Sequence, residues 1–244
     1  MCGRYSLQTP LPDLAGILGA GLALKDPGPR FNIAPTDTIA ALRPSDRERK
    51  IVGLRWGLVP SWARDPSRLP LIINARSESL RAKPAFRDLL SDHRCIVAAD
   101  GFYEWRTERG LRQPYYVRRR DGAPLAFAGL WDRRGDEESC AIITTDANAL
   151  LTPLHDRMPV VLAGEEVDRW LDPSVRDFER VRDLLRPAPP DLIEAYPVSA
   201  RVNRVGYDEP ACIEPEGATI ASVERWADRP EAGSAAESGQ LGLF

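Results

Sequence analysis

The chain has 244 residues, of which 43% are hydrophobic and 28% charged, and its formal net charge is -3 at pH 7. This size and composition are typical of a soluble globular protein with a real core, and no apolar segment is long enough to span a membrane. The negative charge excludes nucleic-acid binding by overall charge alone, so such binding requires a local basic face.

Cysteine usage points to a reducing compartment. The four cysteines, Cys2, Cys95, Cys140 and Cys212, are widely separated and contain no CxxC pair. This spacing gives no sign of a zinc cluster or a disulfide framework. The apolar run at 14–24 has neither the basic flank nor the cleavage site of a signal peptide. We therefore expect a cytoplasmic protein with free thiols.

The amino-terminal third alternates short strands with short helices. Alternating apolar patterns predict strands, and an amphipathic pattern predicts helices, one of them interrupted at Pro84. The predicted strands are Gly3–Leu7, Thr38–Leu42, Lys50–Trp56 and the strand end Leu71–Asn74; the helices are Pro12–Leu18 and Ser77–Leu90.

The rest of the chain is rich in predicted strands. They are Cys95–Ala98, Phe102–Arg106, Tyr115–Arg118, Ala126–Trp131, Cys140–Thr144, Met158–Leu162 and Leu192–Val198. Helical patterns cover Ala147–Leu151, Gly164–Leu171 and Val175–Leu185. We predict an α+β fold: a single domain with a curled, mostly antiparallel, barrel-like sheet and peripheral helices.

The composition changes near the carboxyl end. From about Ala227, Pro, Gly, Ser, Ala and Glu dominate, and Gln240–Phe244 is apolar again. We predict one folded domain over residues 1–224 and a disordered tail over 225–244.

The stretch Met1-Cys2-Gly3-Arg4-Tyr5 carries the first chemical signal. A small residue after the initiator normally allows Met1 to be removed, which leaves an amine and a thiol on adjacent carbons of Cys2. Both groups titrate near neutrality, and a 1,2-aminothiol captures aldehydes as a thiazolidine. The alternative is an ordinary cysteine on a fraying terminus.

Two further titratable residues are candidates for acid–base work. Glu104 lies among Phe102, Tyr103 and Trp105, where burial would raise its pKa. The alternative is an exposed glutamate on an edge strand. His155 lies in a loop between a helix and a strand, where an ordinary loop histidine is the alternative reading.

Polar and aromatic residues elsewhere suit a nucleic-acid ligand. Asn74 could orient a substrate oxygen or a nucleophile, although it could equally cap a helix. Arg76 could hold a phosphate. The tryptophans Trp56, Trp62 and Trp105 could stack on bases, although core packing is the commoner use of such rings.

Ten short motifs follow one another along Cys2–Tyr207. They are MCGRY, FNIAPT (31–36), RWGLVPSW (55–62), INARSES (73–79), KPAF (83–86), RCIVAADGFYEW (94–105), PYY (114–116), FAGLW (127–131), TTDAN (144–148) and LHDRMPVVL (154–162). Taken together and in this order, these motifs resemble the SOS-response-associated peptidase (SRAP) family of abasic-site processing proteins. One departure is Ala98-Ala99, where the family usually has a proline.

The resemblance implies that Cys2, after autocatalytic removal of Met1, forms a thiazolidine crosslink with an abasic site in single-stranded DNA. It implies that Asn74, Glu104 and His155 complete the catalytic site, and that no metal or cofactor is needed. AP-lyase or crosslink-reversal activity would accompany this chemistry. The residues expected to contact DNA are Arg4, Asn32, Pro35, Trp62, Arg76 and Trp105.

The tail offers a second resemblance. Gln240-Leu241-Gly242-Leu243-Phe244 is similar to the short clamp-binding peptide of bacterial replication and repair proteins. We expect a nucleoid-associated monomer that docks on a sliding clamp through Gln240, Leu241, Leu243 and Phe244. Two other functions stay open: an amino-terminal-nucleophile peptidase or amidase acting on other molecules, and a non-covalent single-strand binding module.

Overall fold

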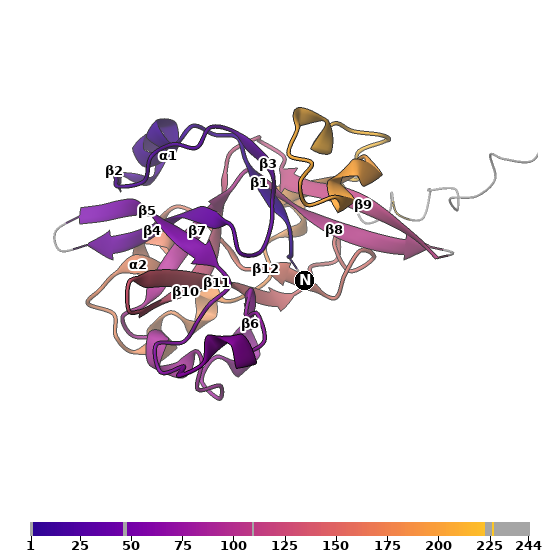
Figure 1. The fold of residues 1–244 in the computed structure, drawn as a ribbon. Coiled ribbons are helices and arrows are strands. Elements are labelled where there is room, and N and C mark those ends of the chain that lie inside the picture. Colours follow the sequence, from indigo (N-terminus) through magenta and orange to yellow (C-terminus); the bar gives the residue numbers. More distant parts are fainter. Residues whose placement is uncertain (1, 46–47, 109, 223–225, 227–244) are drawn as a thin grey trace, which may run out of the picture.

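Five strands close into a barrel at the centre of the molecule (Figure 1). The computed structural model describes residues 2–45, 48–108, 110–222 and 226. Neighbouring strands in the barrel are antiparallel until β11 meets β5 in parallel, with Cys140 opposite Trp56, and closes the ring. In spatial order the strands are β5 (Glu48–Trp56), β4 (Thr38–Ser45), β7 (Arg94–Ala99), β10 (Leu125–Arg134) and β11 (Glu137–Asp146).

A second, antiparallel sheet lies beside the barrel and contains the first strand of the chain. Its order is β14 (Ile193–Pro197), β9 (Leu111–Arg119), β8 (Gly101–Glu108), β1 (Tyr5–Leu7) and β3 (Arg30–Ile33). Because β1 pairs with β8 on one side and β3 on the other, the residues directly before β1 are held close to this sheet.

Short elements complete the domain. Two α-helices occur among the described residues, α1 (Leu11–Leu18) and α2 (Glu165–Leu171), and the second packs on β7. The remaining strands are β2 (Gly21–Leu22), β6 (Asn74–Arg76), β12 (Arg157–Pro159) and β13 (Val161–Leu162). The predicted single domain with a mostly antiparallel, barrel-like core and peripheral helices is confirmed, and its content is mostly β. No helix among the described residues is long and apolar enough to cross a membrane.

Packing explains why β7 departs from simple alternation. All six residues of β7 are buried, because the strand is part of the barrel wall and α2 packs against it from outside. Large rings fill the space between the two sheets: Tyr5 from β1 meets Trp56 edge-on at 5.3 Å, and Phe102 meets Phe127 at 5.9 Å. Buried aromatic pairs of this kind join the sheets into one core.

Asp100 and Gly101 hold the amino-terminal segment in place. The Asp100 carboxylate accepts hydrogen bonds from Thr9 N at 2.7 Å, Thr9 Oγ1 at 2.6 Å and Gln8 N at 2.5 Å. A Cβ on Gly101 would lie 2.4 Å from the Tyr116 ring. Glycine therefore lets Tyr116 reach Ser6 Oγ at 2.7 Å.

Two predicted helices are replaced by tighter turns. Within 77–90 and 175–185 the structure has only 3-10 helices, at Ser77–Ser79, Arg87–Leu89, Phe178–Arg180 and Arg182–Leu184. Pro84 removes a backbone donor in the first segment. The buried Arg94 guanidinium binds backbone carbonyls on both sides, including Leu90 O at 2.6 Å and Val175 O at 2.7 Å. These bonds fix the backbone at the end of the first segment and at the start of the second.

Smaller differences concern the element ends. The structure splits the expected strand at 158–162 into β12 and β13, has a turn at 147–151, and moves the predicted strand end at 71–74 onto β6. Trp226, which the composition assigned to the tail, is buried. The rest of the predicted tail, including Gln240–Phe244, lies outside the described residues.

Replacing Asp100 by alanine should lower the free energy of unfolding by about 2 kcal/mol, because it strips a charged acceptor from three donors. Urea unfolding followed by tryptophan fluorescence measures this loss. Asp136→Ala is the control, since Asp136 is exposed in a turn. Equal stability of the two variants would contradict the inferred role of Asp100.

Candidate active site

Cys2 is enclosed by the protein although it is the second residue of the chain. Its exposed fraction is 0%, and its carbonyl oxygen accepts a hydrogen bond from Asn74 Nδ2 at 2.9 Å. The reading of Cys2 as an ordinary residue on a fraying terminus is therefore wrong. The pairing of β1 on both sides gives the physical reason.

The Cys2 thiol is kept protonated by its surroundings. Burial raises its pKa well above the usual range, and the negative charge of Glu104 raises it further. The sulfur lies 3.9 Å from the backbone oxygen of Arg4, the partner to which the thiol donates. In this state Cys2 carries a thiol rather than a thiolate.

Asn74 is a strand residue that reaches the start of the chain. It lies on β6, opposite Ile142 of β11, so the alternative of a helix cap is wrong. Its Nδ2 binds the Cys2 carbonyl, whereas its Oδ1 is buried and has no hydrogen-bond partner within the described structure. A buried acceptor without a partner is costly, and it marks a place where a donor from a ligand or a new amine would fit.

Glu104 is buried on a central strand. Its exposed fraction is 2%, and β8 lies between β1 and β9, so the alternative of an exposed edge glutamate is wrong. Burial raises its pKa to about 6, against the positive charge of the chain's amino terminus. A carboxyl group with this pKa exchanges protons readily near neutral pH.

His155 ends the turn that precedes β12, and its pKa is lowered by burial, its largest cause. Its Nδ1 lies 3.0 Å from the amide nitrogen of Arg157 and 2.7 Å from Asp156 Oδ1. The amide requires an unprotonated Nδ1, whereas the carboxylate would require a protonated one. The Arg157 amide can only donate, so its bond assigns Nδ1 as the acceptor. Since burial lowers the pKa and favours the neutral imidazole, the proton of that ring is then on Nε2.

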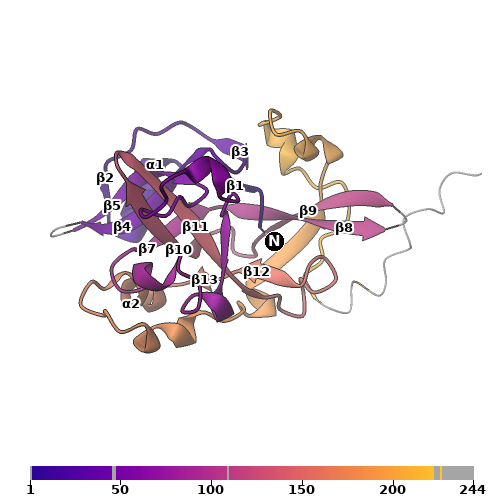
Figure 2. The ribbon, with the colours of Figure 1, turned by 60° about the horizontal axis from the view of Figure 1, so that its bottom comes forward.

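Glu104 and His155 line an open cleft of about 520 Å³. The start of the chain lies beside β8 and β12 in both ribbon views (Figures 1 and 2). The cleft is lined by Gly3, Arg4, Glu104, Trp105, Arg112, His155 and Asn203. Cys2 and Asn74 do not line the cleft. Cys2 directly precedes the lining residue Gly3, is hydrogen-bonded to Asn74, and has its thiol within reach of the Glu104 charge.

The residues expected to contact DNA divide into three groups. Arg4 and Trp105 line the cleft, while Arg76 and Trp62 are exposed outside it and Pro35 is half-buried. Asn32 is 1% exposed, and its amide donates to the carbonyls of Val202, Arg204 and Tyr207. Since its Oδ1 also accepts from Arg4 at 2.7 Å, Asn32 holds Arg4 in place rather than facing a ligand. Trp56 is a core residue at 0% exposure.

Arg112 and Asn203 also line the cleft, although no sequence motif predicts them as site residues. Arg112 places its guanidinium 5.6 Å from the centre of the Trp105 ring, and Asn203 Oδ1 accepts from Trp105 Nε1 at 2.7 Å. The contact with Asn203 spans 98 residues, so no local pattern marks it. For Arg112, the hairpin formed by β8 and β9 is the signal that places it near Trp105, because Arg112 lies opposite Thr107 on the neighbouring strand.

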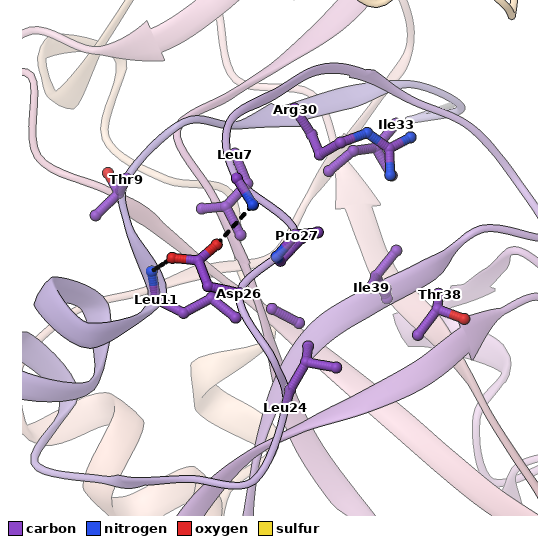
Figure 3. Close-up of a pocket in the computed structure, with 12 residues that line it drawn as sticks. Leu7, Thr9, Leu11, Leu24, Asp26, Pro27, Arg30, Ile33, Thr38 and Ile39 are labelled. Atoms are coloured by element: carbon purple, nitrogen blue, oxygen red, sulfur yellow. Dashed lines mark hydrogen bonds between the residues drawn. The ribbon is translucent and has the colours of Figure 1, made fainter.

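A second cavity, between α1 and the strands β3 and β4, is structural. Its volume is about 20 Å³, and Figure 3 shows apolar side chains around most of it. Asp26 accepts from Leu11 N at 3.0 Å and Gly28 N at 2.8 Å, which caps the start of α1. Space for about one water molecule does not make a ligand site. No cluster of three or more metal-binding side chains occurs within the described residues.

Comparison with known proteins identifies relatives along most of the chain. A family model described as SOS response associated peptidase (SRAP) matches residues 1–205. The abasic site processing protein YoqW of Bacillus subtilis is 37% identical over 222 residues, which cover 88% of this chain and 99% of that protein. The abasic site processing protein YedK of Escherichia coli is 30% identical, over 88% of this chain and 100% of that protein.

The similarity extends to an animal protein and to solved structures. The abasic site processing protein HMCES of Gallus gallus is 36% identical over 69% of this chain and 58% of its own length. A crystal structure of a protein from Bacteroides thetaiotaomicron superimposes with a TM-score of 0.77 at 26% identity, covering 88% of this chain and 99% of that one.

Proposed function

The chain belongs to the SOS response associated peptidase (SRAP) family, and from that premise we propose that it processes abasic sites in single-stranded DNA by forming a covalent crosslink through Cys2. Relatives named for abasic-site processing support the substrate. The observation that carries the proposal is that Glu104 and His155 line one open cleft next to Gly3, while Asn74 binds the carbonyl of Cys2 and the charge of Glu104 reaches the Cys2 thiol.

The reaction joins the amine and thiol of Cys2 to the aldehyde of the ring-opened sugar. Removal of Met1 frees the amine, which adds to the aldehyde carbon and loses water to give a Schiff base. The sulfur then adds to the same carbon while the thiol proton passes to nitrogen. The balance is one aminothiol and one aldehyde giving one thiazolidine and one water. Because the Schiff base is consumed, it no longer drives strand cleavage by β-elimination.

Glu104 and His155 supply the proton transfers in this proposal. With a pKa of about 6, Glu104 is mostly ionised at pH 7 yet protonates readily, so it can take a proton from the attacking amine and return it to the departing hydroxyl. Neutral His155, with its proton on Nε2, can donate a hydrogen bond to a sugar oxygen during Schiff-base formation or reversal.

Asn74 and the buried thiol favour attack by the amine before attack by the sulfur. Asn74 holds the Cys2 carbonyl through Nδ2, and its unpaired Oδ1 offers an acceptor for the freed amine or a sugar hydroxyl. The raised pKa of the thiol keeps the sulfur protonated until the imine carbon is beside it. Glu104, whose charge reaches the thiol, is the base available to take that proton.

The same two titratable groups support self-directed removal of Met1. Glu104 and His155 lie at the cleft next to Gly3, close in sequence to the bond between Met1 and Cys2. One can activate water while the other protonates the departing amine. AP-lyase activity and crosslink reversal are the Schiff-base branch of the same chemistry, in which the imine is not trapped by sulfur.

DNA binding in this proposal uses backbone contacts and stacking, because chemistry on the sugar requires no base readout. Arg4 and Arg76 are the proposed phosphate contacts, and Trp62 and Trp105 the proposed stacking surfaces. Trp62 is 55% exposed, so more than half of its surface is accessible to a ligand. A net charge of -3 makes such local arginines necessary.

Cys2→Ala should abolish a denaturation-resistant adduct with a single-stranded oligonucleotide that contains one abasic site. Cys2→Ser is the matched variant that replaces only the sulfur by oxygen. Like Cys2→Ala it keeps an α-amine once Met1 is removed, so borohydride should still trap a Schiff base, but the stable thiazolidine adduct should be lost. Denaturing gels and intact mass measure both products, and intact mass also reports whether Met1 is absent. A stable adduct in Cys2→Ala would show that the nucleophile is another residue.

Glu104→Gln should slow crosslinking by about 10²- to 10⁴-fold, the usual contribution of a general acid or base. The wild-type rate should change through an inflection near pH 6, since burial raises the pKa of Glu104 to about 6. The variant should lose that inflection. Rapid-quench crosslinking between pH 5 and pH 8 measures it, and an unchanged inflection in the variant would assign it to another group.

The carboxyl-terminal Gln240–Phe244 is proposed to bind a bacterial sliding clamp. Its apolar residues at the end of a polar segment are the support for this proposal. Deleting the five residues should remove clamp binding in surface plasmon resonance, while crosslinking to abasic DNA stays unchanged. Replacing Ser234 and Ser238 by alanine is the control in the same tail. Retained clamp affinity after the deletion would refute the assignment.

A further inference from the structure

Trp226 is an anchored residue beyond the family match. The match ends at residue 205, yet Trp226 is 8% exposed and belongs to the main core. Its Nε1 donates to the carbonyl oxygen of Leu150 at 2.9 Å. Its ring lies 5.4 Å from that of Tyr115 and 5.2 Å from the guanidinium carbon of Arg106.

Two of these contacts lie on the face of the sheet that carries Glu104. Tyr115 is directly opposite Glu104 in the pairing of β8 with β9. Arg106 follows Glu104 by two positions on β8. Residues opposite one another, and residues two apart on a strand, share one face of a sheet. Trp226 therefore covers the sheet beside the Glu104 side chain.

The third contact belongs to the turn that carries His155. Leu150 precedes Leu151, whose carbonyl oxygen accepts hydrogen bonds from Leu154 N at 2.8 Å and His155 N at 3.0 Å. The indole N–H of Trp226 thus binds the carbonyl of Leu150, and the next carbonyl, that of Leu151, holds the backbone of His155. One side chain from the end of the domain touches both the strand of Glu104 and the turn of His155.

We propose that Trp226 is a positioning residue for the active site, which joins the strand of Glu104 to the turn of His155 and excludes water from one side of Glu104. This inference rests on the proposed function only in treating Glu104 and His155 as the catalytic pair. Trp226 acts through those two residues.

The electrostatic consequence has a definite sign. Burial is the largest cause of the raised pKa of Glu104. Around it lie the thiol of Cys2, the chain's terminal amine, Arg106, Tyr115, His155 and Asp156. Removing the indole admits water without removing any of these groups. The pKa of Glu104 should then fall from about 6 toward the usual value of about 4.3.

The first test needs no DNA. In the full-length protein labelled with ¹³C at glutamate side-chain carboxyls, the Glu104 resonance is assigned by its loss in Glu104→Gln and titrated in Trp226→Ala. We expect its pKa to fall by about one unit. Ile17→Ala, a change at a residue of α1 that is 62% exposed, is the control and should leave the titration unchanged.

The second variant covers the case in which Trp226→Ala does not fold. Trp226→Phe keeps a ring against Tyr115 but has no N–H for Leu150. It should leave the Glu104 titration close to wild type and shift the His155 imidazole resonances. Unchanged Glu104 titration in a folded Trp226→Ala protein, or unchanged His155 resonances in Trp226→Phe, would overturn the proposal.

Crosslinking assays separate this inference from the proposed function. If the wild-type protein forms the adduct, the pH inflection of its rate should move to lower pH in Trp226→Ala, whichever protonation form of Glu104 is active. If the wild type forms no adduct while the carboxyl titration still shifts, the proposed function fails and the positioning role of Trp226 stands. If the wild type forms the adduct, but neither the Glu104 titration nor the pH inflection of the rate moves in Trp226→Ala, the positioning role fails and the proposed function stands.

Discussion

The structure depends on the pairing of β1 between β8 and β3. A strand of three residues, Tyr5–Leu7, is held on both sides and reinforced by the Asp100 carboxylate just beyond it. This converts the start of the chain, normally a mobile segment, into a fixed part of the core. Any chemistry at Cys2 therefore begins with a positioned backbone rather than with one that must be ordered when substrate binds.

Burial has two effects at this site. It places Cys2 and Glu104 in the interior, where their neutral forms are favoured, and it lowers the pKa of His155. Each shift leaves its group close to the protonation state that the proposed proton transfers use. The Asn74 oxygen, which has no hydrogen-bond partner among the described residues, belongs to the same site, because a buried acceptor of this kind calls for an explanation and a bound donor would supply one.

The segment after β14 contributes Asn203 to the cleft that His155 also lines. Residues 199–213 pack on β8 and β9 beside the cleft (Figure 1) and place backbone carbonyls where Asn32 and Arg4 bind them. Asn203 in turn fixes Trp105. Arg4 and Trp105 are thus oriented by residues far away in the sequence, which restricts the rotamers of both side chains before any ligand binds.

The sequence by itself determined most of the longer strands, the fold class and the identity of Cys2, Asn74, Glu104 and His155 as candidates, because alternation and motif order are local signals. It did not predict the short strands β2 and β3. It could not distinguish a buried Glu104 from an exposed one, or a strand at Asn74 from a helix cap. Those choices depend on which strands become neighbours, and the pairing of β6 with β11 and the placement of β8 between β1 and β9 decide them. The roles of Asn32, Asn203 and Trp226 are likewise set by contacts with residues far away in the chain, which no local pattern records.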